Sequence, residues 1–238
     1  MSSLPDVVDK WEKYYVKDLK EDYLIPNEYV VRSFLGNYPN LRMDKQYAGK
    51  RVCDISCGDG RNIVLLNKLK LDIYGTEISE KICQITQDKL FNHADRIQSK
   101  IQKGFNWDLP FEDAFFDYAL SWNAIYYMRD AAALIEDHIT EYARILKKDG
   151  YLICSVPTPN CFSLENAIPL GNNLIQLNPQ FDWGGRGIHK DTIYYRFDSF
   201  EHIEKIFGDS FYNFQKCTIS DDCYGLKLEY FVFVCQRK

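Results

Sequence analysis

The sequence predicts an α/β fold built on a doubly wound, mostly parallel sheet. Short apolar runs alternate with amphipathic, helix-like segments between residues 50 and 156, and a glycine-containing turn follows the first apolar run. Two further apolar runs close the chain. With 238 residues, of which 46% are hydrophobic, the chain can bury a substantial core. We therefore expect a single domain, residues 1–238, with a seven-stranded sheet.

Residues 1–49 are expected to form a helical N-terminal cap. One amphipathic stretch lies around Val7 to Lys17, and a second, around Asn27 to Phe34, can begin with Asn27 as its capping residue. Neither stretch carries a motif with catalytic chemistry.

Residues 50–156 are expected to form the parallel, cofactor-binding core. The expected strands are Arg51 to Ile55, Leu71 to Thr76, Ile97 to Lys103, Phe116 to Ser121 and Tyr151 to Val156. The helix before the last strand is marked by apolar residues at helical spacing between Ile135 and Leu146. Gly150 is expected to end this helix.

The last third of the chain is expected to cover the core and to extend its sheet. Residues 157–197 are rich in Pro, Asn and Gly and form a longer connection than is usual, so we expect a loop that caps the substrate site. Within residues 198–238, a helix is expected near Ser199 to Phe207. The apolar runs Phe211 to Ile219 and Leu226 to Cys235 can then pair as a C-terminal antiparallel hairpin.

Composition limits the classes of partner. A net charge of −5 argues against a surface built to bind nucleic acid. The N-terminus is charged where a secretory signal is apolar, and no apolar run reaches the ~20 residues of a membrane span. We therefore expect a cytoplasmic protein without a membrane partner. We expect it to be a monomer or a homodimer. Eight cysteines without a CxxC pair or matching histidines predict reduced, mostly buried thiols and no metal site.

The most informative stretch is Val52 to Leu66, VCDISCGDGRNIVLL. A strand ends in Asp54, a turn contains Gly58 and Gly60, and a helix begins at about Gly60. Glycine permits positive φ and a close approach of the backbone to a ligand, and the helix N-terminus offers unpaired N–H groups. This order of strand, glycine turn and helix indicates a nucleotide site.

A carboxylate closes the next strand. Glu77 ends DIYGTE, and a carboxylate at a neighbouring strand end can accept hydrogen bonds from both hydroxyls of an adenosine ribose. The alternative is that Glu77 only favours the start of the helix that follows Ser79.

From about Arg51 to Pro157 the chain resembles the class I S-adenosylmethionine-dependent methyltransferases, whose fold is Rossmann-like. Besides the glycine turn, DLPFEDAFFDYALSWNAIYYMRD resembles the family block in which an LPF turn precedes the fourth strand. EYARILKKDGYLICSVP resembles the E-x-x-R-x-L-K helix and fifth strand. The resemblance implies S-adenosylmethionine as cofactor and S-adenosylhomocysteine as product.

The resemblance also implies roles for individual residues. Asp54 would orient the methionine amino group, and the backbone of residues 58–60 would run alongside the methionine portion. Glu77 would hold the ribose, and Ile78 would pack on the adenine. Ser56 stands in place of the first glycine of the family pattern acidic-x-Gly-x-Gly-x-Gly, a departure that is tolerable if the φ of Ser56 is negative.

At the end of the third strand the sequence departs from the family. Many relatives carry an aspartate after the glycine there, which binds the adenine amino group, whereas Gly104 is followed by Phe105. Asn106 is the nearest substitute, with Trp107 packing near the cofactor. The alternative is that Phe105 and Trp107 are core aromatics.

Polar and aromatic residues at the strand ends on the ligand side are candidates for contact with the acceptor, and Trp122 also for contact with the cofactor. They are Trp122, Asn123, Tyr126 and Tyr127 after the fourth strand, Asn160 after the fifth, and Asp182, Trp183, Arg186 and His189 in the long loop. Many relatives have a histidine pair at the position of Tyr126 and Tyr127. His189 and Tyr127 are therefore the catalytic candidates, with a surface or structural role as the alternative for His189.

The other three histidines are assigned no catalytic role. His93 and His202 fall in peripheral helices, and His138 is expected on the exposed side of its helix.

Arg186, Lys190 and Arg196 concentrate positive charge in the cap, which suits an anionic acceptor, with a solvated loop surface as the alternative. The sequence thus predicts methyl transfer to a small acceptor such as a sugar or a nucleotide-linked polysaccharide precursor. The alternatives are a protein or RNA methyltransferase, an NAD-dependent oxidoreductase on a similar fold, and a non-catalytic subunit that binds S-adenosylmethionine.

Overall fold

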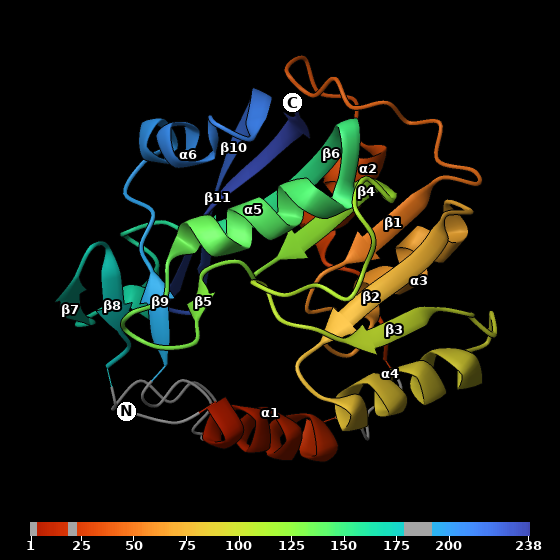
Figure 1. Ribbon diagram of the computed structural model, residues 1–238, viewed down its shortest axis with the longest axis horizontal. Coiled ribbons are helices and arrows are strands. Elements are labelled where there is room, and N and C mark those ends of the chain that lie inside the picture. Colours follow the sequence, from red (N-terminus) through yellow and green to blue (C-terminus); the bar gives the residue numbers. More distant parts are fainter. Residues whose placement is uncertain (1–3, 19–22, 179–191) are drawn as a thin grey trace.

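The computed structural model describes residues 4–18, 23–178 and 192–238 (Figure 1). A seven-stranded sheet has the order β10-β11-β6-β4-β1-β2-β3. Its strands are β1 (Arg51–Asp54), β2 (Asp72–Glu77), β3 (Lys100–Lys103), β4 (Phe116–Trp122), β6 (Leu146–Pro157), β10 (Phe211–Cys223) and β11 (Leu226–Arg237). Strands β3, β2, β1, β4 and β6 run parallel, whereas β10 and β11 pair antiparallel. The predicted Rossmann-like sheet with its C-terminal hairpin is confirmed.

Helices cover both faces of this sheet, and one helix lies apart from it. The helices are α1 (Leu4–Asp18), α2 (Glu28–Leu35), α3 (Arg61–Lys68), α4 (Glu80–Asn92), α5 (Ile135–Ile145), α6 (Phe200–Phe207) and the short 3₁₀ turn η1 (Phe162–Leu164). Figure 1 shows α5 crossing the sheet over β4 and β6, and α1 along the lower edge of the molecule. None of the helices in the described ranges is long and apolar enough to cross a bilayer.

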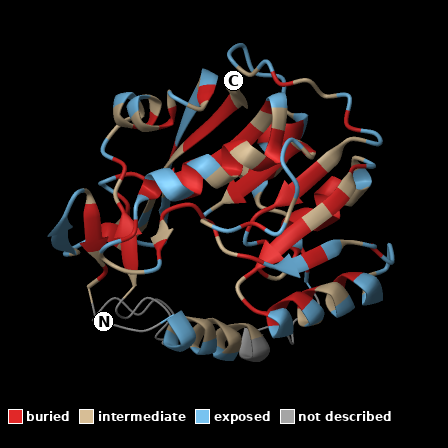
Figure 2. Ribbon diagram, viewed as in Figure 1, coloured by how far each residue is buried: buried red, intermediate tan, exposed pale blue. Residues whose placement is uncertain are grey.

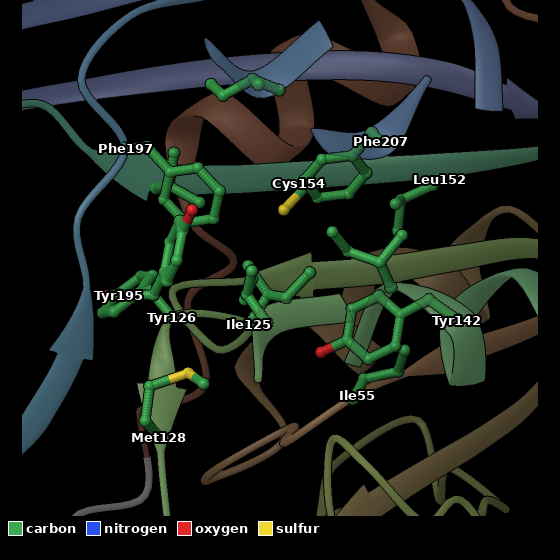
Figure 3. Packing of buried hydrophobic residues seen from close by; sticks show 14 of the residues in the cluster. Ile55, Ile125, Tyr126, Met128, Tyr142, Leu152, Cys154, Tyr195, Phe197 and Phe207 are labelled. Carbon is green, nitrogen blue, oxygen red and sulfur yellow. The ribbon is translucent and has the colours of Figure 1, made fainter. Parts of the chain in front are cut away.

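The strands bury both faces because alternate residues enter two separate clusters. Cys53, Leu152 and Cys154 pack in the cluster beneath α5 and α6, whereas Val52 and Ile153 face the cluster with α2 and α3. Figure 2 shows the central strands buried along their length, and Figure 3 shows part of the first cluster, in which side chains of β6 pack between α5 and α6. Near-continuous apolar runs are therefore required in β1, β4 and β6.

Helix caps agree with the sequence. The side chain of Asn27 accepts a hydrogen bond from the backbone N–H of Tyr29 at 2.9 Å, and Ser199 accepts one from His202 at the start of α6. All eight cysteines are free thiols, and six of them are buried, as predicted.

One helix end was predicted wrongly. α5 ends before Leu146, and Gly150 lies within β6 instead of closing the helix. The register explains the difference, since Phe116 pairs with Leu146 but Tyr118 pairs with Tyr151. β6 thus bulges opposite β4 and continues the strand through a stretch whose glycine and charged residues resemble a turn.

The segment predicted as a loop cap instead carries most of a second sheet. Its order is β5-β9-β8-β7, and every pairing is antiparallel. The strands are β5 (Tyr127–Met128), β7 (Ile168–Gly171), β8 (Leu174–Gln176) and β9 (Ile193–Tyr195). Strands of two to four residues are too short for a period-2 pattern to be read, and β5 pairs with β9, which lies far from it in sequence. This small sheet builds one wall of the site.

We expect the packing of α6 on the hairpin to contribute strongly to stability. Phe207 is fully buried, and its ring lies 5.2 Å from Phe233 and 5.9 Å from Phe211. Phe207→Ala is predicted to lower the free energy of unfolding by about 3–5 kcal/mol, because it leaves a cavity between α6 and β11. Tyr224→Ala, at a fully exposed ring in the hairpin turn, should change it by less than ~0.5 kcal/mol in the same urea titration. Equal effects of the two substitutions would contradict this prediction.

Candidate active site

A cavity of about 1150 Å³ lies where β1, β2 and β4 end, bordered by the main sheet, α1 and β9. The carboxyl ends of parallel strands are where doubly wound sheets bind ligands. Most of the residues singled out in the sequence line this cavity: Asp54, Ser56, Gly58, Glu77, Ile78, Asn106, Trp107, Trp122, Asn123, Tyr126 and Tyr127. The fold therefore brings side chains from four separate stretches of sequence to one place.

The carboxylate of Glu77 joins the ends of β1 and β2. Its Oε1 accepts a hydrogen bond from the backbone N–H of Gly58 at 2.7 Å, and its Oε2 accepts one from Ile78 at 3.0 Å. The side chain is 5% exposed, and this burial raises the pKa of Glu77 to about 7, although the two N–H donors act in the opposite direction. Glu77 thus fixes the glycine turn in addition to lining the cavity.

Two glycines of the turn serve different purposes. Gly58 has a φ of +60°, and a Cβ there would lie 2.8 Å from the hydroxyl oxygen of Tyr15. Gly60, the N-cap of α3, has a φ of +79°, and a Cβ there would lie 3.1 Å from the Thr86 side chain. Gly60 is not part of the cavity lining, and the absence of a Cβ there lets α4 pack close to the turn. The absence of a Cβ at Gly58 instead leaves space beneath α1.

Ser56 departs from its expected conformation. The condition for tolerating a serine here was a negative φ, but the φ of Ser56 is +55°, in the left-handed region that costs an L-residue roughly 1–2 kcal/mol. The turn is held in this shape by β2, since the N–H of Ser56 donates to Thr76 Oγ1 at 3.2 Å and the N–H of Cys57 donates to the Thr76 carbonyl at 3.0 Å. The sequence thus keeps a serine where backbone geometry favours the family's glycine.

Asp54 carries an unsatisfied buried oxygen. It is 1% exposed and lines the cavity, and its Oδ2 has no hydrogen-bond partner among the residues that the structure describes. Burial, with Glu77 and Asp59 nearby, raises the pKa of Asp54 well above its usual range. A buried carboxyl oxygen in this position suits a cationic hydrogen-bond donor on a ligand, such as an amino group.

Asn106 is held by a buried hydrogen-bond network. Its Nδ2 donates to the carbonyl of Ala124 at 2.9 Å, and its Oδ1 accepts from the hydroxyl of Tyr142 at 2.9 Å. That hydroxyl also lies 3.2 Å from Ser121 Oγ. The Nδ2 end of the Asn106 amide therefore fastens the loop after β3 to the segment after β4, and the Oδ1 end fastens the same loop to α5.

The neighbours of Asn106 form a stack of rings. Phe105 and Trp107 are parallel, with centroids 5.0 Å apart, and His138 stacks on Trp107 at 5.7 Å. The placement of His138 on an exposed helix face was wrong, because it is 1% exposed and its Nδ1 pairs with the Ile125 carbonyl at 2.8 Å. Burial lowers the pKa of His138 to about 4, so the ring is neutral at physiological pH.

Tyrosines form the wall of the cavity nearest the small sheet. Tyr126 is buried and Tyr127 half-buried, and their rings lie 4.7 and 4.6 Å from Tyr194 of β9. Burial raises the pKa of Tyr127 to about 12, opposed by hydrogen bonds with Tyr194 and Tyr126. At neutral pH the Tyr127 hydroxyl is protonated and can donate a hydrogen bond, but it is a poor base.

Some candidates are not brought to the cavity. Asn160 lies outside the lining, where its Nδ2 donates to Glu229 Oε1 at 2.9 Å. Arg196 pairs with Asp198 at 2.8 Å. Five candidates of the long loop lie outside the described residues, and their roles stay predictions: Asp182, Trp183, Arg186, His189 and Lys190.

The sequence analysis missed the contribution of α1. Trp11, Tyr14 and Tyr15 of this helix line the cavity. Lys10 Nζ donates to Thr192 Oγ1 at 3.3 Å beside β9, and Glu12 pairs with Lys81 of α4 at 3.4 Å, so α1 bridges the small sheet and the main fold across the cavity. The signal was present, since aromatic residues three and four positions apart share one face of a helix.

Comparisons with known proteins agree with this geometry. Residues 53–154 match the family model described as a methyltransferase domain. A solved S-adenosylmethionine-dependent methyltransferase from Methanosarcina mazei is 16% identical, with a TM-score of 0.64 over 89% of this chain and 98% of that chain. No curated protein matches the sequence.

Two further solved structures are similar. One is from Thermotoga maritima, an S-adenosylmethionine-dependent methyltransferase described as a possible histamine N-methyltransferase; it is 24% identical, with a TM-score of 0.54 over 79% of this chain and 83% of that chain. The magnesium protoporphyrin IX methyltransferase of Synechocystis, solved with bound S-adenosylhomocysteine, is 21% identical, with a TM-score of 0.53 over 80% of this chain and 75% of that chain. At these identities the likeness shows a shared fold.

The network around Asn106 should be sensitive to the loss of one hydroxyl. Tyr142→Phe is expected to lower the free energy of unfolding by about 1–3 kcal/mol, because Asn106 Oδ1 and Ser121 lose a buried partner. Tyr151→Phe is the control, since the Tyr151 ring stacks on Tyr118 and its hydroxyl joins no such network; it should change stability by less than ~0.5 kcal/mol. Chemical denaturation of both variants measures the difference.

The buried carboxyls should make stability fall with rising pH. The folded protein binds protons at Asp54 and Glu77 more tightly than the unfolded chain, so these two groups weaken folding as pH rises from about 5 to about 8. Without cofactor, Asp54→Asn is therefore expected to gain stability relative to the unsubstituted protein across this window, measured by thermal unfolding. For Asp209→Asn, at an exposed site, the difference in stability from the unsubstituted protein should be the same at every pH in this window. A constant difference for Asp54→Asn as well would refute the assignment.

Proposed function

We propose that this chain is a class I S-adenosylmethionine-dependent methyltransferase and that it transfers the methyl group to a small molecule bound in the cavity at the ends of β1, β2 and β4. The observation that carries the proposal is that the glycine turn, Glu77 and the tyrosines after β4 border one continuous space. Sites for single small ligands have volumes of roughly 300–1,000 Å³. A cavity of about 1150 Å³ thus has room for a cofactor and an acceptor together.

The residues at the glycine turn fit S-adenosylmethionine. The unpaired Oδ2 of Asp54 is suited to the methionine ammonium group, and the Glu77 carboxylate, already fixed by two N–H donors, is suited to ribose hydroxyls. Ile78 offers an apolar surface to the adenine. The Asn106 amide already forms hydrogen bonds with Ala124 and Tyr142. The side chain could therefore recognise the adenine amino group only if one of these hydrogen bonds broke.

When bound, S-adenosylmethionine supplies a methyl group that is already electrophilic. The protein has to align the acceptor and exclude water, and oriented reactions reach effective molarities of roughly 10⁵–10⁸ M. α1 supports both tasks, because it spans the cavity and places Trp11, Tyr14 and Tyr15 in its lining.

The position of α1 also favours a small acceptor over a protein or RNA. α1 is attached to α4 on one side and to the residue before β9 on the other, so a polymer would have to pass this bridge to reach the glycine turn. The sugar-like or nucleotide-linked acceptor predicted from the sequence depends on Arg186, which lies outside the described residues, and it stays a prediction.

Cofactor binding provides the direct test. Glu77→Gln is expected to weaken S-adenosylhomocysteine binding by about 10- to 100-fold in isothermal titration calorimetry, because hydrogen bonds to a charged group contribute about 1.5–3 kcal/mol. Glu80→Gln, three residues later and exposed, should bind normally. Circular dichroism of both variants checks that they are folded. Binding of NAD in place of S-adenosylhomocysteine would overturn the proposed function.

A further inference from the structure

Four aromatic side chains from three parts of the chain meet on one side of the cavity. This aromatic wall consists of Trp11 of α1, Tyr126 and Tyr127 after β4, and Tyr194 of β9, all of which line the cavity. The centroid of the Tyr127 ring lies 5.7 Å from Trp11, 4.9 Å from Tyr126 and 4.6 Å from Tyr194. Aromatic faces carry negative electrostatic potential and attract cations placed over them.

The arginines of the described lining are already neutralised. Arg61 pairs with Asp59 at 3.0 Å, and Arg129 pairs with Asp130 at 3.2 Å while its guanidinium lies 5.6 Å from the Trp107 ring. Neither group presents unpaired positive charge to an anionic acceptor. The described lining thus combines electron-rich rings with two arginines whose charges are compensated.

The described lining also provides no ready base for a hydroxyl acceptor. It contains no histidine, Tyr127 keeps its proton at neutral pH, and the carboxyls of Asp54 and Glu77 lie at the glycine turn, where the proposed function assigns them to the cofactor. A hydroxyl gains from a base that removes its proton during methyl transfer, whereas a neutral amine nitrogen reacts through its lone pair without one. The lining therefore favours nitrogen as the accepting atom.

We propose that the acceptor is a small amine whose nitrogen receives the methyl group, and that the aromatic wall stabilises the positive charge that develops on this nitrogen. The inference rests on the proposed function. The nitrogen lone pair forms the new N–C bond while the S–C bond breaks and its electron pair stays on sulfur. The positive charge thereby moves from sulfur to nitrogen, and a proton, if the amine carried one, leaves to water after transfer.

The wall acts in two ways on such an acceptor. Ring faces interact with a cation more strongly than with a neutral group of the same shape, so they favour the product and the transition state over the neutral amine. Burial away from water acts in the opposite direction on the free amine, because it disfavours the protonated form and so offsets the attraction that the rings also exert on that form.

Three probes of one shape and different charge test the proposal. Choline, its neutral carbon isostere 3,3-dimethylbutan-1-ol and the anion 3,3-dimethylbutanoate are titrated by calorimetry into the protein loaded with S-adenosylhomocysteine. Choline is expected to bind at least tenfold more tightly than the alcohol, and the anion most weakly. Equal binding of choline and the alcohol, tightest binding of the anion, or no measurable binding of choline would overturn the proposal.

Matched variants locate the effect. Tyr127→Phe keeps the ring and should keep the tenfold preference for choline, whereas Tyr127→Leu removes the π face and should reduce the preference to less than about threefold. Tyr224→Leu, at the exposed turn of the β10–β11 hairpin, is the surface control and should behave as the unsubstituted protein. A preference that survives Tyr127→Leu would show that the wall does not carry it.

A parallel titration separates this inference from the proposed function. If S-adenosylhomocysteine binds but choline has no advantage, methyl transfer stands and the amine acceptor is wrong. If S-adenosylhomocysteine does not bind, the proposed function fails, and the three probes titrated into the cofactor-free protein still decide whether the wall prefers cations. Labelled methyl transferred in a native cell extract should likewise appear in products that cation-exchange resin retains at pH 7, and label confined to anionic products would contradict an amine acceptor.

Discussion

The carboxylate of Glu77 is the contact on which the site depends. It stands at the end of β2 and accepts hydrogen bonds from Gly58, in the turn after β1, and from Ile78, at the start of the next connection. A buried carboxyl with two N–H donors has one favoured position, and it fixes the turn in relation to the neighbouring strand. The same turn is fastened from the other side by Thr86 of α4, whose hydroxyl donates to the Gly58 carbonyl at 2.8 Å.

The site is formed under local strain and with incomplete hydrogen bonding. Ser56 adopts a left-handed conformation, and Asp54 buries an oxygen without a partner. Each feature is unfavourable in the free protein, and a cofactor that donates to Asp54 would remove part of the penalty. We infer that binding energy in this protein is coupled to the stability of the β1–α3 turn.

The opposite side of the cavity depends on elements that are distant in sequence. α1 joins α4 and the small sheet through polar contacts that include those of Glu12 and Lys10, while its aromatic residues line the cavity. The small sheet combines β5, directly after β4, with strands more than thirty residues later. The acceptor end is thus assembled only when the N-terminal helix and the segment after β6 both pack on the core.

Local patterns in the sequence determined the parallel core and the glycine-turn end of the cavity. Apolar strands, the glycine turn and the acidic end of β2 follow one another within residues 51–77, so their proximity follows directly from strand order. Tertiary structure decided what no local pattern encodes: the positive φ of Ser56, imposed by hydrogen bonds to Thr76, and the burial of His138 against Trp107. It also decided the second sheet and the aromatic wall, because short strands and a distant helix acquire their partners only through long-range packing.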